Sequence, residues 1–183
     1  MQWILITHNS SAAKKMQAWQ AQRVVYSRTM KPFNIVLIEP EIPPNTGNIA
    51  RLCAATGTVL HLVGRLGFSL DDRYLKRAGL DYWEFVDLKL WPDLETLQAA
   101  APEGRFFYLS TKVDRSYLQA GFQPGDYIVF GKETKGLPEE LLDANPETSF
   151  TIPMPAEKVR SLNLSTSAGI VLYEAMRQCG EIS

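Results

Sequence analysis

Short apolar runs alternate with helical patterns from residue 33 onward, and this alternation limits the fold more than any other feature of the chain. The first run, at residues 33–38, has the length and the branched side chains of a buried strand. Parallel strands need long crossovers, which helices usually supply. The pattern therefore predicts an α/β fold with a mostly parallel sheet flanked by helices, and it predicts strands at 33–38, 58–63, 105–110, 126–130 and 149–152.

The helix after the first strand has a clear apolar face. Apolar or half-apolar residues recur there at i, i+3, i+4 and i+7, namely Ile49, Leu52, Cys53 and Thr56. Gly57 follows as a stop signal, and we expect the helix to begin near Gly47. Pro92 and Pro138 each stand where a further helix can start, and residues 164–178 are predicted to form a long closing helix.

The chain of 183 residues suits one domain of ordinary size. Met30 stands directly before the first predicted strand and is a candidate translation start. Residues 1–29 are then a leader outside the fold, and residues 30–183 form the single domain. Three interpretations of the leader stay open: an upstream or artificial extension, a basic arm that touches RNA, and a targeting peptide.

Charge is distributed unevenly along the chain. Residues 1–29 contain four basic residues and no acidic one. Subtracting these four charges from the whole-chain charge of −1 leaves −5 for residues 30–183. A net-acidic body argues against indiscriminate binding of nucleic acid, so any contact with RNA must come from a local basic patch.

The remaining totals exclude several classes of protein. No apolar run approaches the ~20 residues of a membrane span, so we expect no membrane partner. The two cysteines, Cys53 and Cys179, form neither a disulfide framework nor a metal clip, which favours the cytoplasm. His8 and His61 are the only histidines, and neither a Ser-His-Asp triad nor a metal site can be assembled from them. We therefore expect no metal, and we expect His61 to be a core histidine.

Three polar stretches follow predicted strands, at the edge of the sheet where ligands bind in α/β proteins. Residues 45–51 (NTGNIAR) follow the first strand, and residues 130–137 (FGKETKGL) follow the fourth. Residues 152–154 (IPM) and 161–165 (SLNLS) follow the fifth. Because the carboxyl ends of parallel strands share one edge, we expect the three stretches to build one site.

Each stretch also has a purely structural interpretation. Asn45 is placed to cap a helix, and Arg51 to pair with a surface carboxylate such as Glu39 or Glu41. The alternative for these residues is a helix start that attracts phosphate or ribose, with Arg51 as a clamp. Residues 131–136 suit an ordinary loop as well as a ligand loop, and either Ser161 or Asn163 is suited to cap the last helix.

The three stretches, in this order, resemble the SPOUT class of S-adenosylmethionine-dependent RNA methyltransferases over roughly residues 33–178. The resemblance is greatest to small single-domain members that methylate the ribose 2'-hydroxyl at the tRNA wobble position, a pyrimidine. It implies a homodimer, tRNA as partner and a deep C-terminal trefoil knot, which local pattern alone would not predict. It also places S-adenosylmethionine, the methyl donor, against Leu109, Gly131, Ile152, Met154, Ser161 and Leu162.

The resemblance further maps the catalytic region onto Arg51, Glu133, Ser161 and Asn163, with Asn45 in support. A guanidinium is a poor base, so we expect Arg51 to stabilise the developing alkoxide and to orient the neighbouring phosphate. Small members lack a separate RNA-binding domain, so contacts to phosphate are expected from Arg65, Arg73, Lys76, Arg77, Lys132, Lys135, Lys158 and Arg160. Two alternatives stay open: a related enzyme with another tRNA or rRNA target, and a non-catalytic RNA-binding relative.

Overall fold

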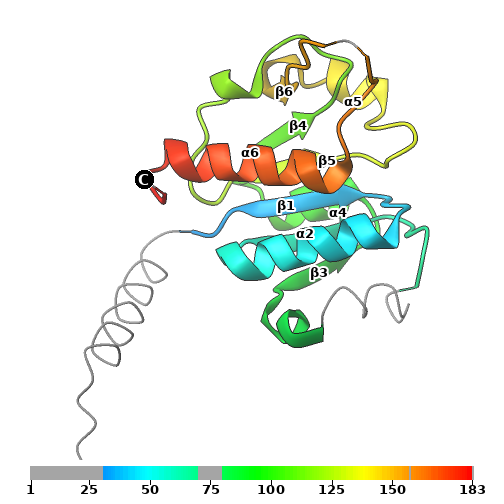
Figure 1. Ribbon diagram of the computed structural model, residues 1–183, viewed down its shortest axis with the longest axis vertical. Helices are drawn as coiled ribbons and strands as arrows, with labels where there is room; N and C mark the ends of the chain where they lie inside the picture. The colour runs from blue at the N-terminus through cyan, green and yellow to red at the C-terminus, as the bar shows by residue number, and fades with distance from the viewer. Residues whose placement is uncertain (1–30, 70–79, 157, 183) are drawn as a thin grey trace, which may run out of the picture. The chain divides into compact units, whose positions relative to one another are not determined.

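A computed structural model describes residues 31–69, 80–156 and 158–182 of the chain (Figure 1). Its sheet has six strands: β1 (Asn34–Ile38), β2 (Val59–Val63), β3 (Leu88–Trp91), β4 (Phe106–Leu109), β5 (Tyr127–Phe130) and β6 (Ser149–Phe150). They lie in the order β3-β2-β1-β5-β4-β6, and every neighbouring pair is parallel. The expected parallel α/β sheet is therefore confirmed. The expected leader, residues 1–29, lies outside the described residues.

The strand order reverses direction between β1 and β5. From β1 the chain builds outward through β2 to β3, and the later strands then fill the opposite side. In open α/β sheets, the crevice beyond the carboxyl ends of two strands at such a switch point is the usual ligand site. The loops that follow β1 and β5 meet at this crevice.

Strand β3 was not predicted from the sequence. Its four residues are half-buried or exposed, so they lack the continuous apolar run of the central strands. It pairs with β2 from Leu60↔Leu88 to Val63↔Trp91 and forms one edge of the sheet. A short edge strand that carries a lysine, here Lys89, is typical of a protected sheet edge.

Helices cover both faces of the sheet. The helices α2 (Pro43–Thr56) and α6 (Leu164–Gln178) pack against each other over one face, while α4 (Leu94–Ala100) lies behind the sheet (Figure 1). Alternate strand residues divide accordingly, because successive side chains point to opposite faces. Ile35 and Leu37 join the core under α2 and α6. Val36 joins the second core with residues of α4 and of the short helix α5 (Glu139–Asp143).

Helix α2 begins at Pro43, four residues before the expected start near Gly47. Two consecutive prolines occupy its first turn, where a missing backbone N–H costs no helical hydrogen bond. The helix ends at Thr56, directly before the predicted stop signal Gly57, whose φ of 72° is left-handed and favours glycine. Helix α6 matches its predicted range of 164–178.

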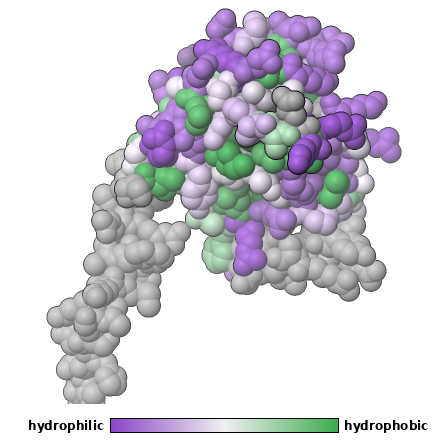
Figure 2. All heavy atoms as spheres, turned by 45° about the horizontal axis from the view of Figure 1, so that its top comes forward, coloured by the Kyte–Doolittle hydropathy of each residue, from purple (hydrophilic) through white to green (hydrophobic). Residues whose placement is uncertain are grey.

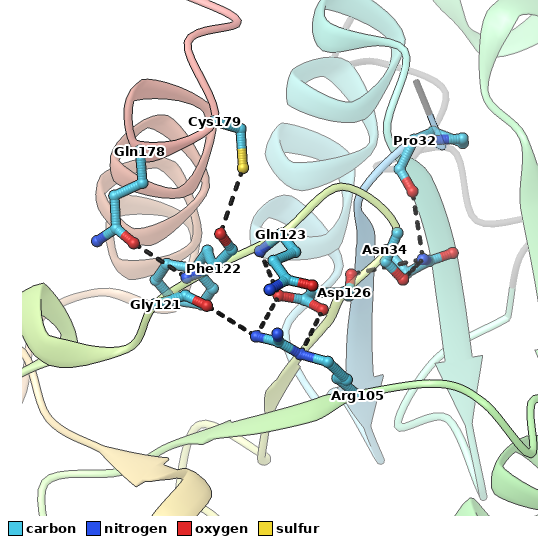
Figure 3. Close-up of polar contacts among 10 residues, drawn as sticks. Pro32, Asn34, Arg105, Gly121, Phe122, Gln123, Asp126, Gln178 and Cys179 are labelled. Carbon is cyan, nitrogen blue, oxygen red and sulfur yellow. Dashed lines mark hydrogen bonds and ion pairs between the residues drawn. The ribbon is translucent and has the colours of Figure 1, made fainter. Parts of the chain in front are cut away.

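Polar contacts close the amino edge of the sheet (Figure 3). The Asp126 carboxylate, 3% exposed, accepts from the Arg105 guanidinium and from the backbone N–H of Gln123 at 2.6 Å. The Gln178 side chain accepts from the Phe122 backbone N–H at 3.0 Å and so attaches the end of α6 to the same loop. This edge is therefore occupied by structural contacts, and the opposite edge is left for a ligand.

Candidate active site

A cavity of about 260 Å³ lies over the carboxyl ends of β4 and β5. Its walls come from the segments after these strands, from the loop after β6 and from the start of α6. All six residues expected to hold the cofactor line it, namely Leu109, Gly131, Ile152, Met154, Ser161 and Leu162. The sheet order thus brings together residues up to 53 positions apart in the chain, and their part in binding stays a prediction.

Gly131 is required by a close approach of the chain to itself. A Cβ atom at this position would lie 2.2 Å from the carbonyl carbon of Gly136 and 2.4 Å from its oxygen. The loop closes through the Gly136 N–H, which donates to the Lys132 oxygen at 2.8 Å, and Gly136 has a left-handed φ of 67°. Both glycines therefore shape one compact turn on the cavity wall.

Glu133 connects this turn to the loop after β1. Its carboxylate accepts from the backbone N–H of Glu41 at 2.8 Å and from that of Ile42 at 3.2 Å. It also accepts from the Asn45 side-chain amide at 2.9 Å. Three donors thus fix a carboxylate that also lines the cavity.

Asn163 extends this network to the third stretch. Its amide nitrogen donates to the Asn45 Oδ1 at 2.8 Å. Its oxygen accepts from the backbone N–H groups of Ser165 and Thr166, which makes it the N-cap of α6. The capping interpretation of Asn163 is therefore confirmed, and its part in catalysis stays a prediction. Glu133, Asn45 and Asn163 form one continuous chain of hydrogen bonds.

The anion-binding interpretation of the α2 start is not supported by its backbone. Pro43 and Pro44 have no N–H, and the N–H groups of Asn45 and Thr46 are directed to the Ile42 oxygen at 3.0 and 3.4 Å. Asn45 does not cap the helix either, because the N-cap position belongs to Ile42, and Asn45 lies buried in the first turn. The capping expectation was wrong because the helix starts earlier than its apolar periodicity indicates, and a contact of Arg51 with phosphate or ribose stays a prediction.

Of the two remaining site candidates, Ser161 lines the cavity and Arg51 does not. Ser161 is exposed and lines the cavity, and it does not cap α6. Arg51 is exposed on α2, eight residues beyond Pro43 or about 12 Å along the helix axis. It is not among the residues that line the cavity. Helical side chains tilt toward the amino end of their helix, which for α2 is the end where Asn45 meets Glu133.

The sequence suggested Glu39 and Glu41 only as partners of Arg51, and it did not predict the contacts that they make with the turn after β5. The Glu41 carboxylate accepts from the Thr134 hydroxyl at 2.7 Å and from its N–H at 3.2 Å, and Lys132 forms an ion pair with Glu39. Glu39 has a φ of 47°, a left-handed conformation that costs a non-glycine residue on the order of 1–3 kcal/mol. The position of Glu39 and Glu41 directly before the 45–51 stretch was the one sequence feature that could have indicated these contacts.

Of the basic residues expected to contact phosphate, Lys132, Lys135 and Arg160 line the cavity. Arg65 lines a neighbouring depression of about 360 Å³, to which Lys132 also contributes. Lys158 is exposed in the loop before α6. Arg73, Lys76 and Arg77 lie outside the described residues.

His61 lies in the core, as expected, and away from the cavity. The Trp91 indole N–H donates to its Nδ1 at 2.9 Å, so its Nε2 carries the hydrogen and donates to the Asn34 Oδ1 at 3.0 Å. Burial lowers the pKa of His61 to about 4, which keeps the ring neutral near pH 7. Within the described ranges, no cluster of three or more His, Cys, Asp or Glu residues is arranged to hold a metal ion. No helix in this part of the chain is long and apolar enough to cross a lipid bilayer.

A parallel sheet with a cavity over the carboxyl ends of two of its strands, beside the switch point, defines an α/β protein that binds a small ligand there. A family model described as the SpoU rRNA Methylase family matches residues 32–173. The chain belongs to the SpoU rRNA Methylase family.

Two curated relatives illustrate how close the similarity is. The tRNA (cytidine(34)-2'-O)-methyltransferase of Methylovorus glucosotrophus (strain SIP3-4) is 55% identical over 147 residues, which cover 80% of this chain and 95% of that protein. The enzyme of the same name from Escherichia coli (strain K12) is 50% identical over 149 residues, covering 81% of this chain and 94% of that protein.

Solved structures agree with this placement. One, from work on the 2-OH methylation of C/U34 on tRNA, aligns with a TM-score of 0.76 at 47% identity and covers 81% of this chain and 96% of that chain. The SpoU methyltransferase AviRb from Streptomyces viridochromogenes, in complex with AdoMet, aligns with a TM-score of 0.72 at 21% identity, covering 81% and 61%. The second similarity shows a shared fold.

Proposed function

We propose that the chain is an S-adenosylmethionine-dependent enzyme that methylates the ribose 2'-hydroxyl of cytidine 34, the wobble nucleotide of tRNA. The observation that carries this proposal is the identity of 50–55% over four fifths of the chain to enzymes named for that reaction. The same reaction was expected from three motifs, which the fold gathers at one edge of the sheet.

The residues of the cavity suit the proposed cofactor. Leu109, Ile152, Met154 and Leu162 offer apolar walls for an adenine ring, and the Gly131 backbone is not covered by a side chain. The Glu133 carboxylate lines the same cavity and would supply a negative charge that suits a sulfonium cation. The pocket therefore has both an apolar and an anionic part.

When bound, the cofactor supplies a methyl group that is already activated on a sulfonium. The protein must then hold a ribose hydroxyl in line with that methyl, about 3 Å away, and stabilise the oxygen as its proton passes to solvent water. We assign the stabilisation of that oxygen to Arg51, a permanent cation. We assign the ordering of the loops around that site to Asn45, Glu133 and Asn163, which are joined by hydrogen bonds. Ser161, which lines the cavity, belongs to the same group.

Four further properties belong to the proposal: a knot, a dimer, a compartment and contacts to tRNA. The C-terminal segment, including α6, forms a deep trefoil knot, as expected from the resemblance to the SPOUT class. The enzyme acts as a homodimer, in which exposed residues of α6 such as Tyr173 meet the partner. It works in the cytoplasm, where both cysteines stay free, and Lys132, Lys135, Arg160, Arg65 and Lys158 contact tRNA phosphates. Sedimentation at several concentrations tests the dimer.

Mapping of 2'-O-methyl groups tests the function. The full chain is incubated with labelled S-adenosylmethionine and tRNA from a strain that lacks the corresponding enzyme, and the modified position is read by sequencing. Label at nucleotide 34 is the expected result. Label at another tRNA position or only on ribosomal RNA would favour a related enzyme, and binding of tRNA without transfer would favour a non-catalytic RNA-binding protein.

A further inference from the structure

Two loops of the active site hold each other through reciprocal contacts. The Glu133 carboxylate accepts from the backbone N–H groups of Glu41 and Ile42 at 2.8 and 3.2 Å. In the opposite direction, the Glu41 carboxylate accepts from the Thr134 hydroxyl at 2.7 Å and from its backbone N–H at 3.2 Å. Lys132 adds an ion pair to Glu39. We call the contacts between residues 39–42 and 132–134 the clasp.

The two sides of the clasp serve different parts of the reaction. The loop with Thr134 lines the cofactor cavity. The loop with Glu41 leads directly into α2, which carries Asn45 and Arg51. Strands β1 and β5 are neighbours, so the clasp joins the loops that follow two paired strands. It therefore links the cofactor side of the site to the substrate side.

Glu41 itself is separated from the cofactor. It does not line the cavity of about 260 Å³ but a shallower depression beside it, together with Glu39, Arg65 and Lys132. Its side chain is only half-buried and Thr134 is exposed, so water competes for each hydrogen bond. Two donors from one residue, the hydroxyl and the N–H, offset that competition in a way that a single bond would not.

We propose that Glu41 is a positioning residue, which acts through Thr134 to keep Glu133, Asn45 and Asn163 in register between cofactor and nucleotide. This inference rests on the proposed function and adds to it a group that touches neither the cofactor nor the ribose. A displacement of about 1 Å in such a site can cost about 100-fold in rate, so a contact outside the cavity can control turnover.

The test compares five variants with the full-length wild-type chain: Glu41→Ala, Thr134→Val, their combination, Glu41→Gln, which keeps an acceptor oxygen, and the control Glu103→Ala. We expect Glu41→Ala and Thr134→Val each to lower kcat about 30-fold, while the KM for S-adenosylmethionine changes by less than about 3-fold. The combined variant should be no worse than Glu41→Ala alone, because both changes remove one shared contact. Glu41→Gln should restore most of kcat, and Glu103→Ala, at an exposed glutamate far along the chain, should leave it unchanged.

Amide exchange of Thr134 gives a readout that does not depend on activity. We expect its N–H to exchange at least about 10-fold faster in Glu41→Ala than in the wild type, because its acceptor is gone. Each of three results would overturn the inference. They are unchanged exchange of the Thr134 N–H, additive losses of kcat in the combined variant, and a fall in the number of cofactor-binding sites per chain that parallels the loss of kcat. If the wild-type chain does not methylate tRNA, the proposed function fails, and the exchange measurement still decides whether the clasp exists.

Discussion

At the scale of the residue, one amide group of Asn163 serves two elements. Its oxygen caps α6, and its nitrogen donates to Asn45 at 2.8 Å. These roles can be separated by chemistry, because aspartate caps a helix as well as asparagine does but offers no N–H.

Asn163→Asp should therefore keep the helix cap and lower methylation by about 10-fold or more, since the bond to Asn45 is lost. Asn163→Ala should lower methylation and also cost about 1 kcal/mol of stability through the lost cap. Urea denaturation and a tRNA methylation assay measure the two effects. Equal activity of Asn163→Asp and the wild type would show that the bond to Asn45 is dispensable.

The proposed role of Arg51 in methyl transfer can also be separated from the binding of the cofactor. Arg51→Ala should nearly abolish methylation, because the cation that stabilises the developing alkoxide is lost. The affinity for S-adenosylmethionine should change by less than about 3-fold, because Arg51 does not line the cavity. Single-turnover assays with cofactor titration by calorimetry separate the two quantities. Turnover within a few-fold of the wild type would remove Arg51 from the mechanism.

At the scale of the element, the turn after β5 depends on the absence of a side chain at Gly131. The backbone of Gly136 lies where a Cβ atom would be, and backbone cannot rotate away as a side chain can. The turn is also held from outside by Glu39, Glu41 and Ile42. Its shape thus results from the packing of chain against chain, independent of any ligand.

Gly131→Ala should displace this turn and weaken the binding of S-adenosylmethionine by about 10-fold or more, with a lower Tm. Gly121→Ala is the matched control, because no heavy atom lies within 4 Å of a Cβ added there. Calorimetric titration and thermal unfolding of both variants provide the comparison. Wild-type affinity in Gly131→Ala would mean that the turn does not support the cofactor.

At the scale of the whole molecule, the surface mixes apolar and hydrophilic side chains, and the core contains a buried histidine. Apolar groups on the face in Figure 2 form separate patches among hydrophilic side chains. The core contains one titratable group that joins three strands, since His61 on β2 bonds to Asn34 on β1 and to Trp91 on β3. Its protonation would break the bond that Nδ1 accepts from Trp91.

The pKa of His61, lowered by burial from 6.5 to about 4, makes stability depend on pH. Below pH 6.5 the histidine binds a proton in the unfolded chain but not in the folded chain. The contribution of neutral His61 to the free energy of unfolding is therefore fully present above pH 6.5 and is lost as the pH falls toward 4. The loss should be on the order of 3 kcal/mol for a shift of this size. NMR titration of the His61 ring and urea denaturation between pH 7 and 4 measure it. A ring that titrates near 6.5 would contradict the buried, neutral state.

The sequence by itself determined the class of the fold and most of its elements. Five of the six strands and the full range of α6 follow from apolar periodicity, because the burial of one face is a local property of the chain. Apolar periodicity did not predict strand β3 or the start of α2. The first is too exposed to show a buried run, and the second begins with two prolines ahead of its apolar face.

Only the tertiary structure decided which polar groups meet. Glu133 and Asn45 are 88 residues apart, and Asn163 and Asn45 are 118 apart, yet each pair forms a hydrogen bond. Such contacts depend on the order in which strands assemble, here β1 beside β5, and no local pattern encodes that order. The chain thus specifies its elements through short-range burial, and its site through the long-range arrangement of those elements in the sheet.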